Sequence, residues 1–172
     1  IHDAGNAGKC SPNHVPVAIC ADAVVPAGPE CQADASVNNG SFDPDGDPIT
    51  LSQVPPGPYP LGTNRVTLVV SDSHGASNTC SALVIVQDQT PPLVVCPASM
   101  TVEFQDETGA AVPFVVTASD VCSAVSLVVT PASGSVFPIG VTPVQATAVD
   151  GCTNASQCGF TVTVLGAQGV KS

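Results

Sequence analysis

A short acidic stretch contains the residues of this chain that are best suited to bind a metal ion. Within residues 38–48 (NNGSFDPDGDP), carboxylates stand at alternate positions, at Asp43, Asp45 and Asp47. Two prolines and two glycines in this stretch rule out a helix or a central strand. Alternating aspartates on such a stiff turn can direct several oxygens at one hard cation, most often Ca²⁺. The alternative is an ordinary acidic surface turn, because Asp, Gly and Pro are also the common turn residues.

Four further aspartates extend this prediction. Asp72 ends a predicted strand and is the fourth candidate ligand of the first site. A second site is expected near Asp88, Asp120 or Asp150, the first in a linker and the other two at strand ends. Because the chain carries 14 acidic residues, their mutual repulsion makes bound cations favourable to the folded state. The predicted cofactor is therefore Ca²⁺.

The charge balance excludes several classes of function. The chain has only three scattered basic residues and a formal net charge of −11. Without a basic patch, binding to the phosphates of nucleic acid is excluded, and an anionic membrane surface would repel the chain. No run of 18 apolar residues is present, so no membrane insertion is expected.

Catalysis finds little support in the sequence. The only histidines are His2, His14 and His74, and none lies in a nucleophile motif such as G-x-S-x-G. The glutamates show no paired glycosidase context, and oxidised cysteines leave no Cys–His pair. We therefore expect a protein that is not an enzyme.

Eight cysteines indicate disulfides and an oxidising, extracellular compartment. They are Cys10, Cys20, Cys31, Cys80, Cys96, Cys122, Cys152 and Cys158. No C-x-x-C pair with partner histidines supports a zinc site. One pairing would join the first strand to the last in each of two units, Cys20 with Cys80 and Cys96 with Cys158. Cys122 and Cys152 would then pin two loops together, and Cys10 and Cys31 would pair within the chain or bridge to other subunits.

An internal repeat divides the chain into two units. Residues 59–62 (YPLG), 71–72 (SD) and 79–84 (TCSALV) match 137–140 (FPIG), 149–150 (VD) and 157–162 (QCGFTV), all at an offset of 78. The predicted organisation is an N-terminal extension (1–14), a first unit (15–88), a Pro-rich linker (89–92), a second unit (93–165) and a tail (166–172). The extension is either a leader tethered by Cys10 or a segment that adds to a neighbouring subunit.

The units read as all-β. The chain is rich in β-branched and turn residues, with no Trp, one Tyr and five Phe. Strands are expected at 15–20 with 23–25, 31–36, 49–51, 65–71 and 80–86 in the first unit, and at 100–104, 112–118, 126–130, 143–148 and 160–165 in the second. Six or seven short strands per unit predict two tandem immunoglobulin-like β-sandwich domains, stapled by disulfides.

Two acceptor sequons suggest glycosylation. Asn39 and Asn154 each begin an N-x-S triplet. Many Ser and Thr beside Pro also suit an O-glycosylated surface. Both signals are compositional, and short sequons also arise by chance.

Several segments of the second unit resemble the hyalin repeat (HYR) domain. They are 90–97 (TPPLVVCP), 118–123 (ASDVCS), 130–140 (TPASGSVFPIG), 148–150 (AVD) and 158–164 (CGFTVTV). The first unit is similar to the hyalin-repeat and PKD-like modules of bacterial extracellular proteins, on 41–47 (SFDPDGD) and 71–75 (SDSHG). The cysteine in the turn 150–154 departs from the pattern. The resemblance implies an immunoglobulin-like extracellular module that is adhesive or structural and has no catalytic activity of its own.

These observations predict a secreted or cell-surface structural protein. The leading hypothesis is a Ca²⁺-stiffened subunit of a surface fibre that contacts copies of itself head to tail, or other surface proteins. Alternatives are a segment of an adhesin stalk, a glycan- or protein-binding module of a larger secreted protein, or a receptor-like interaction protein. A glycan-binding module would need an exposed aromatic platform, which a chain without Trp lacks.

Overall fold

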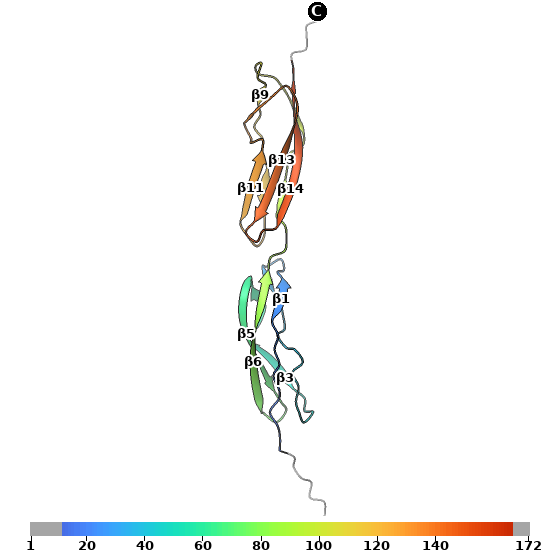
Figure 1. Cartoon of the computed structure of the whole chain (residues 1–172), viewed down its shortest axis with the longest axis vertical. Helices are drawn as coiled ribbons and strands as arrows, with labels where there is room; N and C mark the ends of the chain where they lie inside the picture. The colour runs from blue at the N-terminus through green and yellow to red at the C-terminus, as the bar shows by residue number, and fades with distance from the viewer. Residues whose placement is uncertain (1–11, 167–172) are drawn as a thin grey trace, which may run out of the picture. The chain divides into compact units, whose positions relative to one another are not determined.

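The computed structural model describes residues 12–166, and every regular element in that range is a β-strand. The chain forms two compact units (Figure 1). Unit 1 contains the chain up to Gly28 together with Gln32–Gln87, and unit 2 contains Pro29–Cys31 together with the chain from Asp88 onward. Cys10, most of the predicted extension and residues 167–172 of the tail lie outside the described residues.

Unit 1 is built around one four-stranded sheet with the order β1-β6-β5-β3. Its strands are β1 (Ala23–Pro26), β3 (Thr50–Val54), β5 (Gly62–Ser71) and β6 (Ser77–Gln87). β5 and β6 form the long antiparallel hairpin of the unit, while β1 pairs with β6 in parallel. A second layer contains the short pair β2 (Gln32–Ala33) and β4 (Tyr59–Pro60), and single bridges join Val17 to Phe42 and Cys20 to Asn38.

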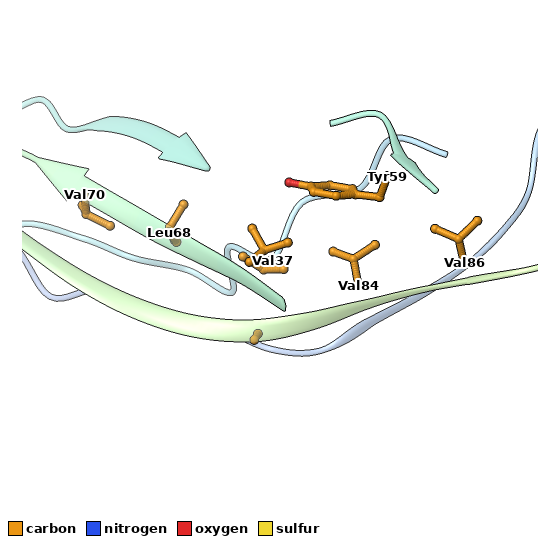
Figure 2. Close-up of a cluster of buried hydrophobic side chains, with 8 residues drawn as sticks. Val37, Tyr59, Leu68, Val70, Val84 and Val86 are labelled. Atoms are coloured by element: carbon orange, nitrogen blue, oxygen red, sulfur yellow. The ribbon is translucent and has the colours of Figure 1, made fainter. Parts of the chain in front are cut away.

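The core of unit 1 follows from strict alternation along the hairpin. Val66, Leu68 and Val70 of β5 are fully buried, while the residues between them are partly exposed. This period of two places one face of the sheet against the opposite layer. Figure 2 shows the Tyr59 ring near Val37 and Val84 within this cluster. The single tyrosine of the chain is thus a core residue, and its hydroxyl donates to the Pro55 carbonyl.

Unit 2 repeats this architecture with a four-stranded sheet of order β11-β13-β14-β8. Its strands are β8 (Met100–Glu103), β11 (Val125–Thr130), β13 (Gly140–Asp150) and β14 (Ala155–Leu165). As in unit 1, the last two strands form the long hairpin and the edge strand β8 pairs with β14 in parallel. The second layer contains the pair β7 (Leu93–Val95) with β10 (Thr117–Ser119) and the pair β9 (Ala110–Ala111) with β12 (Val136–Phe137).

The core of unit 2 contains three phenylalanines, whereas that of unit 1 contains a single aromatic ring, Tyr59. Phe114 packs edge-to-face on Phe137 and Phe160, with ring centroids 6.3 and 5.0 Å apart. The chain comes close to Phe137 at Gly109, where a Cβ would lie only 1.8 Å from the Phe137 carbonyl oxygen. Gly109 also has a φ of 129°, so this position requires glycine on two grounds.

The all-β, disulfide-linked immunoglobulin-like class is confirmed, and most predicted strands are present with shifted ends. The expected single strand at 112–118 is wrong. In the structure β9 ends at Ala111 and β10 begins at Thr117. The chain between them instead bonds to the loop 133–135, where Val112 N donates to Ser135 O and Phe114 N donates to Ser133 Oγ. The expected strand at 31–36 is reduced to the two residues of β2.

Three disulfides are present among the described residues. Cys20–Cys80 and Cys96–Cys158 each tie the start of a unit to its last strand, with Cα–Cα distances of 5.9 Å. Both pairings agree with the sequence prediction. Cys20 and Cys80 pack against the core of unit 1, and Cys96 packs against that of unit 2.

The third disulfide corrects the predicted loop pairing. Cys122 is bonded to Cys31, 91 residues away, and Cys152 is an exposed free thiol. The bond accounts for the grouping of Pro29–Cys31 with unit 2, although the chain on both sides of that segment belongs to unit 1. Sequence alone could not find this pairing, because it depends on a three-residue excursion of the chain.

Replacing both Cys96 and Cys158 by Ala should lower the free energy of unfolding of unit 2 by about 4 kcal/mol, because a closed loop of this length restricts the unfolded chain. Denaturant unfolding of the full chain measures this loss. The matched control is Cys152→Ser, which removes an exposed free thiol and should leave stability unchanged within ~0.5 kcal/mol. An equal loss in the control would contradict the assignment.

Candidate metal centres

The acidic turn of unit 1 folds into a compact group of carboxylates. Ligand oxygens of Asp43, Asp45 and Asp47 all lie within 4.8 Å of one another. Asp43 is only 9% exposed, and its Oδ1 accepts from the backbone N–H groups of Asp45 (2.8 Å) and Asp47 (3.4 Å). Its Oδ2 is buried without a hydrogen-bond partner among the described residues. A buried carboxylate oxygen without a donor is costly unless a cation satisfies it.

Two histidines contact the outer carboxylates of this group. His14 Nδ1 lies 2.8 Å from Asp45 Oδ1, and the His14 N–H donates to Asp45 Oδ2. His74 Nδ1 lies 2.9 Å from Asp47 Oδ2. Sequence patterns predict no role for either histidine, because each contacts the acidic turn only in the folded chain.

Asp72 lies beside this group but is not a member of it. It follows directly after β5, and its Oδ1 accepts from the backbone N–H groups of His74 (2.9 Å) and Ala76 (2.8 Å). Its Oδ2 accepts from Asn13 Nδ2 at 2.9 Å. Asp72 therefore closes the β5–β6 turn and orients His74, instead of completing a fourth corner of the Asp43 group as the sequence predicted.

The second predicted site is assembled in unit 2 by residues from three distant segments. Ligand oxygens of Asp88, Asp120 and Asp150 lie within 4.8 Å of one another. Asp88 follows β6, Asp120 follows β10 and Asp150 ends β13. Asp88 and Asp150 are each only 6% exposed. The three aspartates named from the sequence for this site thus lie close together in the structure.

Hydrogen bonds hold these three carboxylates in place. Asp150 Oδ1 accepts from the N–H groups of Cys152 and Asn154, both at 2.8 Å, and Asn154 Nδ2 donates to Asp150 Oδ2 and to the Asp88 carbonyl. Asp120 Oδ1 accepts from the N–H groups of Cys122 and Ser123. The Ser123 hydroxyl donates to Asp88 Oδ2 at 3.3 Å. Unlike the Asp43 group, this group has a donor for each of its buried oxygens.

The two units use the same device at corresponding positions. Asp72 and Asp150 each end the penultimate strand and accept from the backbone N–H groups two and four residues ahead. The repeat offset of 78 in the sequence already pairs these aspartates. The same offset pairs Ala76 with Asn154, which is the signal that could have identified Asn154.

No lysine or arginine neutralises either group. Arg65 is the only lysine or arginine in residues 12–166, and it lies on β5 without an ion pair to either cluster. In the Asp43 group, His14 and His74 contact only the outer carboxylates of Asp45 and Asp47, and the buried Asp43 Oδ2 has no partner among the described residues. Close carboxylates without a cationic partner repel one another. Both groups are consequently suited to bind a hard cation.

The sequons differ in accessibility. Asn39 is exposed in a turn, whereas both hydrogens of Asn154 Nδ2 are engaged by Asp88 and Asp150. A glycan on Asn154 would replace one of these bonds, so the structure favours Asn39 as the acceptor.

Both a family model and a curated protein match parts of the chain. Residues 87–164 match the family model described as the HYR domain, which confirms the resemblance of the second unit. The chain is 36% identical over 122 residues to hyalin of Strongylocentrotus purpuratus, a match that covers 67% of the chain and 10% of hyalin. The chain thus spans about a tenth of the length of this relative.

Cadherins are among the solved structures that the chain matches. The match to human protocadherin-24 EC1-2 covers 89% of this chain and 99% of the protocadherin chain, with 19% sequence identity and a TM-score of 0.42. The match to Drosophila N-cadherin EC1-4 covers 88% of this chain and 50% of the cadherin chain, with 12% sequence identity and a TM-score of 0.45. The disulfides and the match to hyalin indicate an extracellular protein. Among the described residues no helix is long and apolar enough to span a membrane.

Acid should destabilise the protein through three of these aspartates. Hydrogen bonds from His14 lower the pKa of Asp45, and the bond from Asn13 lowers that of Asp72. Burial raises the pKa of Asp150, but hydrogen bonds from Asn154, Cys152 and Ser123 outweigh burial and hold this pKa below its ordinary value. Their contribution is therefore present above about pH 4 and is lost as pH falls through the lowered values.

Thermal unfolding between pH 6 and 2 measures this effect. The melting temperature should fall most steeply below about pH 4, and Asp72→Asn should flatten the acid limb. Asp34→Asn, at an exposed position outside both groups, is the control. A profile that Asp72→Asn leaves unaltered would count against the role given to Asp72.

Proposed function

We propose that this protein is a non-enzymatic extracellular structural or adhesive module that Ca²⁺ stiffens. The observation that carries the proposal is the Asp43 Oδ2 atom, which is buried among carboxylates and has no donor. A cation at this point would satisfy the orphaned oxygen and offset the repulsion between Asp43, Asp45 and Asp47. We assign no catalytic residue.

Ca²⁺ is the ion whose preferences fit this group. It takes six to eight oxygen ligands in a flexible geometry, whereas Mg²⁺ demands a near-octahedral cage and retains its waters. Asp43 offers one oxygen from a rigid turn, and Asp45 and Asp47 lie partly open to solvent, where water can fill the remaining positions. The group of Asp88, Asp120 and Asp150 is proposed as a second Ca²⁺ position, which would fasten the start of unit 2 to two of its turns.

Calcium should raise the thermal stability of the protein. At a Ca²⁺ concentration about 100 times the dissociation constant, binding contributes about 2.7 kcal/mol, a shift on the order of 10 °C for a unit of this size. Asp43→Asn keeps the Oδ1 acceptor and places an amide at the buried position, so it should abolish the shift of unit 1. Differential scanning calorimetry with Ca²⁺ and with EDTA measures both.

Two comparisons make this test specific. Asp34→Asn removes one charge outside both groups and should retain the full calcium shift. Asp150→Asn should reduce the shift of unit 2 alone. The proposal fails if chelation leaves the melting temperature of the unaltered protein unchanged.

The proposed biological role is that of a repeating subunit in a surface fibre. Two units of one architecture in tandem offer different surfaces at their two ends, and contacts between unlike surfaces that do not close produce filaments. The match of two thirds of the chain to hyalin supports an extracellular structural setting, and we propose unit 1 as a related module. The partners are then copies of this chain or other surface proteins. A segment of an adhesin stalk is the second candidate, since consecutive disulfide-bonded units could also serve as a spacer.

Electron microscopy of the purified protein distinguishes these roles. Filaments in Ca²⁺ that dissociate in EDTA are expected for the fibre subunit. A monomer that stays monomeric at high concentration with Ca²⁺ would contradict the fibre and leave the stalk.

A further inference from the structure

Unit 2 contains a free thiol in the turn that packs against a disulfide-bearing loop. Cys152 is exposed and unpaired in the β13–β14 turn. Cys122, in the loop between β10 and β11, is bonded to Cys31. The proximity of a free thiol and a disulfide is independent of the function proposed above and does not involve a bound ion.

The two loops present their cysteines in equivalent settings. Each cysteine follows an aspartate by two residues, and each backbone N–H donates to Oδ1 of that aspartate at 2.8 Å. The carboxylates of Asp120 and Asp150 themselves lie within 4.8 Å of one another. The loops are therefore anchored side by side through the same pair of turns.

The residues flanking the two cysteines are in contact. A Cβ built at Gly151 would lie 3.6 Å from the Ser123 Cβ, which is ordinary van der Waals distance. Gly151 directly precedes Cys152, and Ser123 directly follows Cys122. Disulfides join residues whose Cβ atoms are about 3.5–4.5 Å apart, and the positions next to the two cysteines already stand at such a distance. The exchange would therefore need a local movement of the turn.

Two residues at or beside these cysteines have an unfavourable backbone conformation. Cys31 has a φ of 58° and Thr153 a φ of 74°, and both are non-glycine residues in the left-handed region. Such conformations cost energy and persist only where the surroundings impose them. Release of Cys31 would remove the covalent restraint on the first, and movement of the 150–154 turn could relax the second.

We propose that Cys152 exchanges with Cys31 as the disulfide partner of Cys122. The Cys152 thiol loses its proton to solvent, and its sulfur attacks Cys122 Sγ. The Cys122–Cys152 bond forms as the Cys31–Cys122 bond breaks, and the electron pair leaves on Cys31 Sγ, which takes up a proton. One disulfide and one thiol are present before and after, so no oxidant or reductant is consumed.

The exchange converts one covalent arrangement of unit 2 into another. With Cys31 bonded, Pro29–Cys31 are fixed to the remainder of unit 2, while the chain on both sides of them belongs to unit 1. After exchange that segment has no disulfide, and Cys31 becomes the reactive thiol. Among the described cysteines, the free thiol would then lie on a different loop.

Thiol mapping on the full chain tests the proposal. The protein is incubated at pH 8 without added thiol, quenched with iodoacetamide at intervals, digested with pepsin under acid, and analysed by mass spectrometry without reduction. The label should begin on Cys152 and shift in part to Cys31, with a Cys122–Cys152 peptide appearing in step. Label that stays on Cys152 alone, with Cys31–Cys122 intact throughout, would overturn the proposal.

Two variants separate this route from others. Cys152→Ser should retain Cys31–Cys122 and give no label at Cys31, and label at Cys31 in this variant would show that the exchange does not use Cys152. Cys31→Ser should form Cys122–Cys152 in a glutathione redox buffer. If Cys122–Cys152 does not form in Cys31→Ser while Cys20–Cys80 and Cys96–Cys158 show correct folding, the two loops cannot reach each other and the proposal fails.

Discussion

Both candidate ion sites depend on one type of hydrogen bond, which the turn backbone donates to an aspartate at the end of a long strand. This aspartate is Asp72 in unit 1 and Asp150 in unit 2. Each closes a long hairpin by accepting two backbone N–H groups from the turn that follows. The carboxylate replaces the ladder bonds that the turn cannot make. Its second oxygen then faces the segment through which the chain enters the unit, which is Asn13 in unit 1 and, through the amide of Asn154, Asp88 in unit 2.

The two units differ in the acidic residues that lie near this aspartate. Unit 1 adds three alternating aspartates from one turn and contacts them with His14 and His74. Unit 2 draws one aspartate from each of three segments and supplies a donor to each buried oxygen. The orphaned Asp43 oxygen therefore makes unit 1 the stronger candidate for an ion, although the sequence gives both units acidic residues.

Disulfide bonds stabilise both units, whose hydrophobic cores are small. Units of this size bury a small core, and here it consists largely of Val, Ala and a few aromatic rings. Cys20–Cys80 and Cys96–Cys158 connect that core to the chain that enters each unit. Cys31–Cys122 has a different role, since it attaches a surface segment instead of reinforcing a core.

Local sequence patterns were sufficient to predict the fold class, the repeat and two of the disulfides. Alternating apolar residues, turn residues and a fixed offset are local signals, and they survive without knowledge of distant contacts. Only the tertiary structure decided that Asp72 stands apart from Asp43, that His14 joins Asp45 and that Cys31 takes the place expected for Cys152. These pairings join segments up to 91 residues apart. No local pattern encodes them, because they depend on which loops the packed sheets bring to the same end of a unit.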